Sequence, residues 1–394
     1  MSTLPVYLDY AASTPVDSRV ADVMHTCLID AGLCGNPAAG DHAFGRMASE
    51  RIEGARSLVA QVIGAAQPDE VIWTSGATES DNLAIIGAAR YRAGSGRHIV
   101  TSVAEHPAVL SACRYLEKQG FKVTYLSPDA LGVIKVAQVE EALTPETTLV
   151  SLMHVNNETG VIQDIAGIGA MCRGRNVLFH VDAAQSVGHL ALDVAAQCID
   201  LLSLSAQKVY GPKGVGALYL NRQTIPRIEP LMFGGDQERG LRPGTVATHQ
   251  VVGMGEAFRI AAESMTDDVS RIGLLQARLW DGIRSLPGVL LNGHPDQRAC
   301  HILNVSVTGV EGESLHYALS EMAVSAGSAC ATERSAPSGV LRSLGRSDQL
   351  ARASVRFSLG RPSTEADIDL AISCFRRAVK RLRDWAPVNE TGVV

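Results

Sequence analysis

VLFHVDAAQS (residues 177–186) and IDLLSLSAQKVYGPKG (residues 199–214) are two short apolar runs, each giving way to small and polar side chains. Runs of this length that are rich in Val, Ile and Leu are typical of strands buried on both faces of a parallel sheet. Ligands of such sheets collect outside the carboxyl ends of the strands. We therefore expect Asp182 and Lys208, which stand where the two runs end, to lie at a ligand site.

The same kind of run recurs between about residue 60 and residue 220, where it alternates with segments of helical periodicity. The further runs are EVIWTSG (70–76), RHIVTSV (97–103), KVTYLS (122–127), TLVSLMHV (148–155) and GALYL (216–220). This alternation predicts an α/β fold with a mainly parallel seven-stranded sheet, flanked by helices on both faces.

The C-terminal third has a different pattern. Apolar residues recur at three- and four-residue steps over 251–283, which predicts one or two long amphipathic helices. A smaller α+β domain is expected to follow, with strands at HILNVSV (301–307), MAVSAG (322–327) and SVRFSLG (354–360). Thr364 and Asp367 have the spacing of a capping box, which predicts a final helix through Leu382.

Composition and charge narrow the class of protein. The chain has 394 residues and is 46% hydrophobic, which suits one large domain with a smaller companion. Its 35 Lys+Arg and 41 Asp+Glu give a net charge of -6, so we expect no direct nucleic-acid partner and no membrane partner. Asp9 and Asp17 would spoil a signal sequence, and no apolar run is long enough to span a membrane. We expect a cytoplasmic protein.

The eight cysteines are scattered along the chain and form no CxxC pair. This spacing indicates neither a zinc knuckle nor a dithiol redox motif, and we expect no metal site. Most of these cysteines are expected to be small core residues.

One further stretch and two residues of the opening runs could bind a charged cofactor. Residues 75–82 follow a predicted strand and precede an apolar helix. Free amides at the positive end of the helix dipole would suit a phosphate. An ordinary capped helix start would show the same sequence pattern. Asp182 needs a cation, which could be a pyridinium nitrogen or a structural arginine. Lys208 could form a Schiff base or be a surface lysine. Together they favour pyridoxal 5′-phosphate (PLP).

Further motifs make the chain similar to a known family. They are YLDY (7–10), GNP (35–37), TSGATESDNLA (74–84), EH (105–106), HVNNETG (154–160), HVDAAQS (180–186), SAQKVYGPKG (205–214), GGDQERGLRPGT (234–245), GSAC (327–330) and VRFSLGR (355–361). The chain closely resembles the cysteine desulfurases of the NifS/IscS type, in the class V aminotransferase branch of fold-type I PLP enzymes. The resemblance implies a large PLP-binding domain at 16–260 and a small domain at 1–15 and 261–394, whose loop at about 325–340 carries a catalytic cysteine.

The resemblance also implies a role for individual residues. Lys208 would form the Schiff base, Asp182 would pair with the pyridine nitrogen, and His106 would stack on the ring and help in proton transfer. Ala77, Thr78 and Ser205 match positions of the phosphate site, and Thr245 matches the residue that reaches the phosphate from the other subunit of a homodimer. Asn157 and Gln185 match residues that contact the ring oxygen and the substrate region. Asn36 and Arg356 match the site of the substrate carboxylate.

Cys330 matches the catalytic cysteine and lies in a stretch of small residues, 325–332, that can bury little apolar area. We therefore expect a mobile loop, whose thiolate takes the sulfur of L-cysteine as a persulfide and leaves L-alanine. The alternative for Cys330 is a buried structural cysteine.

Two departures from the family pattern affect these expectations. Position 207 is Gln, whereas the family usually has a His there that helps hold the cofactor phosphate. The Gln amide can donate a hydrogen bond but carries no charge, so we expect weaker PLP retention. The C-terminal APVNETGVV and Glu333-Arg334 differ from relatives that dock an iron–sulfur scaffold protein. The sulfur acceptor, an iron–sulfur scaffold or a sulfurtransferase, therefore stays open.

Three other functions remain as alternatives: a class V aminotransferase, a selenocysteine lyase, and a degraded homologue that acts as a binding scaffold. The presence of Lys208, Asp182, His106 and Cys330 argues against the last. The pathway that receives the sulfur is equally open: iron–sulfur clusters, thiolated tRNA, thiamin, molybdopterin or phosphorothioate DNA.

Overall fold

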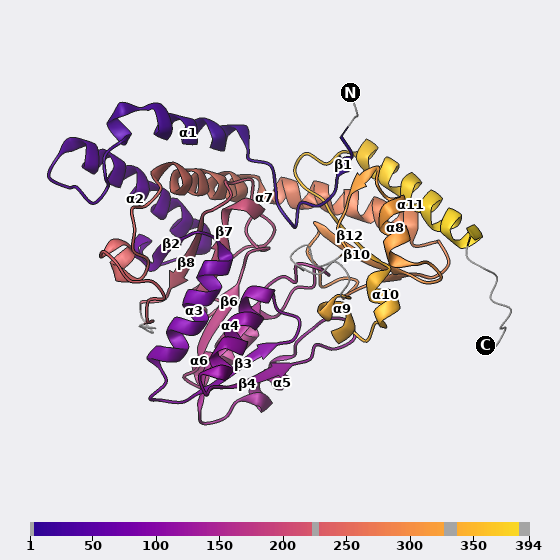
Figure 1. Ribbon diagram of the computed structural model, residues 1–394, viewed down its shortest axis with the longest axis horizontal. Helices are drawn as coiled ribbons and strands as arrows, with labels where there is room; N and C mark the ends of the chain where they lie inside the picture. Colours follow the sequence, from indigo (N-terminus) through magenta and orange to yellow (C-terminus); the bar gives the residue numbers. More distant parts are fainter. Residues whose placement is uncertain (1–3, 223–227, 327–336, 386–394) are drawn as a thin grey trace.

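A seven-stranded mixed sheet is the centre of the fold. The computed structural model describes residues 4–222, 228–326 and 337–385 (Figure 1). In spatial order the strands are β2 (Val71–Thr74), β8 (Gly216–Leu220), β7 (Leu201–Ser205), β6 (Leu178–Asp182), β5 (Thr147–Met153), β3 (His98–Ser102) and β4 (Lys122–Leu126). Only β8 runs antiparallel to its neighbours, β7 and β2. The predicted mainly parallel seven-stranded sheet is confirmed.

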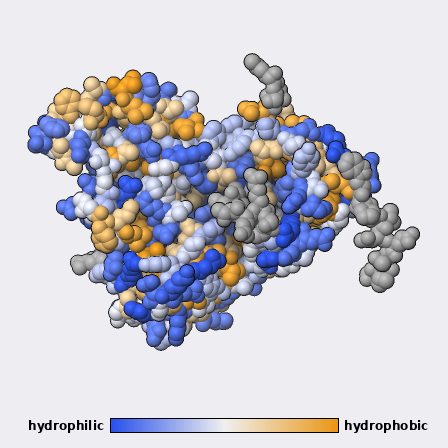
Figure 2. All heavy atoms as spheres, viewed as in Figure 1, coloured by the Kyte–Doolittle hydropathy of each residue, from blue (hydrophilic) through white to orange (hydrophobic). Residues whose placement is uncertain are grey.

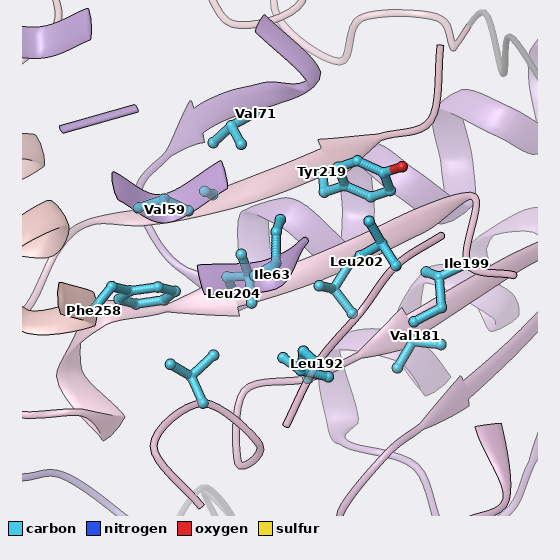
Figure 3. Close-up of a cluster of buried hydrophobic side chains, with 14 of the residues drawn as sticks. Val59, Ile63, Val71, Val181, Leu192, Ile199, Leu202, Leu204, Tyr219 and Phe258 are labelled. Carbon is cyan, nitrogen blue, oxygen red and sulfur yellow. The ribbon is translucent and has the colours of Figure 1, made fainter. Parts of the chain in front are cut away.

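Helices cover both faces of this sheet. One face packs on α3 (Ala77–Tyr91) and α4 (Pro107–Lys118), and the other on α2 (Ala43–Ile63), α6 (Ile165–Gly174) and the first half of α7 (Thr248–Ile283). Along β7, Leu201 belongs to the core under α3 and α4, whereas Leu202 and Leu204 belong to the core on the opposite face of the sheet. Figure 3 shows this second core, in which Leu204 lies near Val59 and Phe258. Because both faces are buried, the strands read as continuous apolar runs.

A single helix, α7, joins the two parts of the molecule. It runs unbroken for 36 residues, so the expected one or two helices are one. Val251, Met254 and Phe258 pack in the core of the large sheet, and Ile272 and Leu279 pack in a separate C-terminal core. Figure 1 shows α7 extending from the sheet toward α11.

The C-terminal core surrounds a three-stranded antiparallel sheet in the order β12 (Ser354–Ser358), β10 (Ile302–Val307), β9 (Val289–Leu291). A two-stranded parallel sheet pairs β1 (Val6–Tyr7) with β11 (Met322–Ala323), so the N-terminus lies against this part. The helices here are α8 (Gly312–Ala318), α9 (Gly339–Ser343), α10 (Asp348–Arg352) and α11 (Glu365–Trp385). The three predicted strands are present, although MAVSAG contributes only the two residues of β11.

The remaining elements are short or peripheral: α1 (Ser18–Ile29), α5 (Val136–Ala142) and the 3-10 turns η1 (Ala31–Leu33), η2 (Pro68–Glu70), η3 (Ala206–Lys208) and η4 (Gln237–Gly240). The capping box before α11 is confirmed, because the Asp367 amide donates to Thr364 Oγ1 (3.2 Å) and the Thr364 amide to Asp367 Oδ2 (2.8 Å). The helix ends at Trp385, beyond the predicted Leu382. Within the described part of the chain, no helix has both the length and the apolarity needed to cross a bilayer.

Candidate active site

A cavity of about 400 Å³ lies at the carboxyl ends of β5, β6 and β7. Ten of the residues singled out from the sequence line it: Ala77, Thr78, His106, Asn157, Asp182, Gln185, Ser205, Gln207, Lys208 and Arg356. The connection after β6 and the turn after β7 bring Asp182 and Lys208 to the same edge of the sheet. Arg356 comes from β12, so the two sheets meet at this cavity.

The start of α3 forms one wall of the cavity. Its N-cap, Gly76, has φ 151°, which favours glycine, and makes no side-chain capping bond. Gly216 of β8 approaches so closely that a Cβ there would lie 2.6 Å from Gly76 Cα. The first-turn amides of α3 and the helix dipole therefore face the cavity without a capping side chain, which suits a phosphate.

Glu79, which also lines this wall, was missed from the sequence. Its carboxylate accepts from the Ser75 amide (2.7 Å) and pairs with Arg242 (3.2 Å). Because Arg242 offsets its charge, Glu79 does not exclude an anion from the helix start.

Asp182 ends β6 and is 6% exposed. Its Oδ1 accepts from the Ala184 amide (2.9 Å). Burial raises the pKa of Asp182, while His106 and Lys208 act to lower it. Asp81 lies fully buried beside it, and burial together with Asp182 raises the pKa of Asp81 well above its usual range. Of the two carboxyl groups, Asp182 is thus the one with the Lys208 ammonium acting on it, and a protonated ring nitrogen fits beside it.

Lys208 lies in η3, directly after β7. Its Nζ donates to the carbonyl oxygens of Ala11 (2.9 Å) and Ala12 (2.6 Å). The Thr14 amide and hydroxyl both donate to the Gln207 carbonyl (2.9 and 3.0 Å), so the N-terminal segment is held against η3. The sequence had indicated no such role for residues 11–14, because this contact joins positions almost two hundred residues apart.

His106 is the N-cap of α4, and its Nδ1 accepts from the Ala108 amide (3.1 Å). With Nδ1 as acceptor, the neutral ring carries its proton on Nε2. The ring is therefore arranged to donate a hydrogen bond or to stack, rather than to take a proton at Nε2.

Arg356 is 1% exposed, and contacts with Asp9 and Asn157 are among those that orient it. Its Nη2 lies 2.6 Å from Asp9 Oδ1, and its Nη1 donates to the Asn157 carbonyl (2.8 Å). Gln185 donates from Nε2 to the Ala11 carbonyl (2.8 Å). A guanidinium placed in this way suits a carboxylate ligand.

Three of the predicted site residues are not brought into this cavity by the described chain. Asn36 is exposed, and its Oδ1 accepts from the Ala38 amide (3.0 Å). Thr245 is also exposed, and Cys330 lies outside the described residues. These assignments stay predictions.

Glu158 is a lining residue that the sequence reasoning missed, although it falls within the HVNNETG motif. It is 5% exposed, and its Oε2 accepts from the Ser338 hydroxyl at 2.5 Å. Burial raises the pKa of Glu158. Ser338 caps α9, so this bond attaches the start of α9 to the cavity wall.

Comparison with known proteins identifies the family. The family model for class V aminotransferases matches residues 6–370. The cysteine desulfurase IscS of Aeromonas hydrophila subsp. hydrophila is 55% identical over 387 residues, covering 98% of this chain and 96% of that protein. The chain belongs to the class V aminotransferases, as a NifS/IscS-type cysteine desulfurase.

Solved structures agree with this cysteine desulfurase in fold. A NifS-like protein matches with a TM-score of 0.88 at 33% identity, over 96% of this chain and 100% of that one. A structure of SspA in complex with cysteine matches with a TM-score of 0.80 at 39% identity, over 91% of this chain and 100% of that one. The predicted fold-type I α/β architecture is confirmed.

Proposed function

We propose that this cysteine desulfurase holds PLP on Lys208 and passes the sulfur of L-cysteine to Cys330, leaving L-alanine. The observation that carries the proposal is the placement of three groups around one cavity. Lys208 and Asp182 stand at the ends of neighbouring strands, and the uncapped start of α3 forms another wall. An amine, a carboxylate and an anion-binding helix start are the groups that PLP requires.

Each part of PLP has a partner among these residues. The amides of Ala77 and Thr78 would bind the phosphate, together with Ser205 and Gln207. Asp182 would keep the ring nitrogen protonated, and His106 would stack on the ring. When bound, PLP supplies an electron sink for the bond-breaking at the substrate Cα.

The protein's own groups would then carry out the proton and sulfur transfers. Arg356 binds the carboxylate of L-cysteine, and the Lys208 amine removes the Cα proton. The Cys330 thiolate attacks the substrate sulfur, so an S–S bond forms and the C–S bond breaks with its electron pair left on carbon. Protonation of that carbon, together with return of a proton from Lys208 to Cα, gives L-alanine, and the sulfur stays on Cys330 as a persulfide.

We also propose a homodimer in which Thr245 reaches the phosphate of the partner subunit. Support comes from exposed apolar side chains on and beside α1 and α2: Leu28 (63%), Ile29 (68%), Phe44 (50%) and Met47 (41%). Figure 2 shows apolar residues gathered over these helices. A patch of this kind marks an interaction surface. We propose that an acceptor protein, an iron–sulfur scaffold or a sulfurtransferase, then takes the sulfur from Cys330.

The test combines the visible absorbance of a PLP Schiff base with product analysis. We expect bound PLP in the wild type and in Cys330→Ser, but no Schiff-base absorbance in Lys208→Ala. With L-cysteine labelled in sulfur, the wild type should form one L-alanine per sulfur transferred, and the label should be on Cys330. Cys34→Ser, which removes an exposed cysteine, is the control and should retain both products.

A wild type that binds no PLP would refute the cofactor assignment. Persulfide formation that persists in Cys330→Ser would refute the role of Cys330. Release of a keto acid instead of L-alanine would support the class V aminotransferase alternative.

A further inference from the structure

A cluster of potential metal ligands lies behind the wall of the active-site cavity. His189, Cys300 and His301 each offer one ligand atom, and these atoms lie within 4.8 Å of one another. The two imidazole rings stack, with centroids 3.6 Å apart and planes inclined by 12°. We call these three residues the His–Cys cluster. None of them takes part in the proposed desulfurase reaction.

The neighbouring Gln185 determines which ring nitrogen of His301 carries the proton. Its Nε2 lies 3.4 Å from Gln185 Oε1, and this amide oxygen can only accept. Gln185 Nε2 donates to the Ala11 carbonyl (2.8 Å), which is consistent with this orientation of the amide. The neutral His301 ring therefore carries its proton on Nε2 and a lone pair on Nδ1. A hydrogen-bond acceptor on the nitrogen that does not bind the metal is what orients metal-bound histidines.

Both imidazoles keep a buried nitrogen without a hydrogen-bond partner among the described residues: Nδ1 of His301 and Nδ1 of His189. His301 is 2% exposed. Buried polar atoms are nearly always satisfied, so two such nitrogens in stacked rings need an explanation. A bound cation would satisfy both.

The donor set selects a soft ion. Two imidazole nitrogens and one thiolate suit Cu⁺ or Zn²⁺ rather than Mg²⁺ or Ca²⁺. Bonds of roughly 2.0–2.3 Å place the donor atoms of one ion about 3.5–4 Å apart, whereas the ligand atoms here lie within 4.8 Å of one another. The site closes when one imidazole turns out of the stack, so that a lone pair of each ring points at the ion.

The surrounding charges favour the monovalent ion. The arginines beside the cluster are already paired, Arg356 with Asp9 (2.6 Å) and Arg361 with Asp17 (3.1 Å) and Asp268 (2.8 Å). The Asp268 carboxylate already accepts from Arg361 Nε (2.8 Å) and from the Ser264 hydroxyl (2.9 Å). Cu⁺ with one thiolate is neutral, whereas Zn²⁺ would leave a buried positive charge that the paired carboxylates around the cluster do not offset.

We propose that His189, Cys300 and His301 form a Cu⁺ site, distinct from the desulfurase chemistry. Binding replaces the thiol proton of Cys300: the S–H bond breaks, the proton leaves to solvent and a Cu–S bond forms with no change of oxidation state. Sequence spacing had predicted no metal site, because His189 and the Cys300-His301 pair are far apart in the chain and meet only in the fold.

The test uses the PLP-loaded Cys330→Ser protein, since the Cys330 thiol would itself bind Cu⁺. Under anaerobic conditions Cu⁺ is titrated against a chromogenic Cu⁺ chelator. We expect one Cu⁺ per chain, with affinity weakened more than about tenfold by Cys300→Ser or His301→Gln, because even outer-shell changes cost about that much. Cys27→Ser, another half-buried cysteine, should bind as the parent does. Zn²⁺ should bind more weakly than Cu⁺.

Retained PLP absorbance shows that each variant is folded. If His301→Gln does not fold, His189→Asn, at a less buried position, replaces it with the same expectation. The proposal is wrong if the Cys330→Ser protein takes no Cu⁺ from the chelator, if Cys300→Ser binds as tightly as its parent, or if Zn²⁺ binds more tightly than Cu⁺.

Discussion

Arg356 Nη2 and Asp9 Oδ1 lie 2.6 Å apart, so an ion pair joins the N-terminal segment to β12 at the edge of the active-site cavity. Arg356 is almost fully buried, and another of its contacts, to the Asn157 carbonyl, comes from the connection after β5. Three separate parts of the chain thus determine where this guanidinium points.

Arg356→Lys should raise KM for L-cysteine by about tenfold or more, with a smaller effect on kcat. A lysine ammonium keeps the charge but cannot contact Asp9, the Asn157 carbonyl and a substrate carboxylate with the planar geometry of the guanidinium. Initial-rate measurements of alanine formation check this, and PLP absorbance serves as the control for folding. An unchanged KM would place the substrate carboxylate elsewhere.

Asp182→Asn should lower kcat by about 100-fold or more while PLP remains bound. The amide cannot provide the negative charge that holds a proton on the ring nitrogen, and loss of one such electrostatic contact typically costs this much. Single-turnover alanine formation, followed beside the PLP spectrum, provides the measurement. The role of Asp182 would be contradicted by a variant with the wild-type rate.

Gln207→His should tighten PLP binding by about fivefold. Gln207 lines the cavity, and a histidine there could add a charge-assisted hydrogen bond to the phosphate, worth about 1 kcal/mol more than the neutral one. The dissociation constant is measured by adding PLP to the apoenzyme. Gln207→Asn, which shortens the amide, should not tighten binding; equal affinities in all three proteins would exclude a phosphate contact at this position.

Glu238→Ala should lower the free energy of unfolding by about 3–5 kcal/mol, because it leaves the buried Arg56 without its main partner. Both Glu238 oxygens lie 2.8 Å from the Arg56 guanidinium, and one also accepts from the Trp73 amide. Glu53 contacts the same arginine but its side chain is 55% exposed, so Glu53→Ala should cost less than about 1 kcal/mol. Urea unfolding compares the two variants; equal losses would contradict this account.

Among the buried histidines, His154 and His180 should each make a contribution that destabilises the fold when the pH is lowered from 7 to 5. Burial lowers the pKa of His154 to about 4 and that of His180 to about 3. Between pH 6.5 and 4 these two histidines therefore bind more protons in the unfolded chain than in the folded one. Their contribution to the free energy of unfolding falls as the pH is lowered. Each histidine contributes up to about 2 kcal/mol at pH 5.

Urea unfolding at both pH values measures this difference. His154→Asn, which removes one of these histidines, should lose less stability, or gain more, between pH 7 and pH 5 than the wild type does. A variant with the same pH dependence would rule out His154 as a contributor.

Much of the fold was predictable because its strands are buried on both faces. The run around Leu201–Ser205 must be apolar on both sides, so its sequence stands out and its end marks Lys208. The short strands β1 and β9 were not predicted, since two or three residues carry no periodic signal. Whether α7 was one helix or two could not be read from its apolar period, which continues from one core into the other.

The sequence alone determined which chemical groups the site contains, because local patterns place Asp182 and Lys208 at the ends of apolar runs and the family motifs assign Arg356. Only the tertiary structure decided how these groups are held: Lys208 by the carbonyls of Ala11 and Ala12, and Arg356 by Asp9. It also brought His189 to Cys300 and His301. The physical reason is that such contacts join distant positions, and their energies depend on burial and geometry that a linear pattern does not contain.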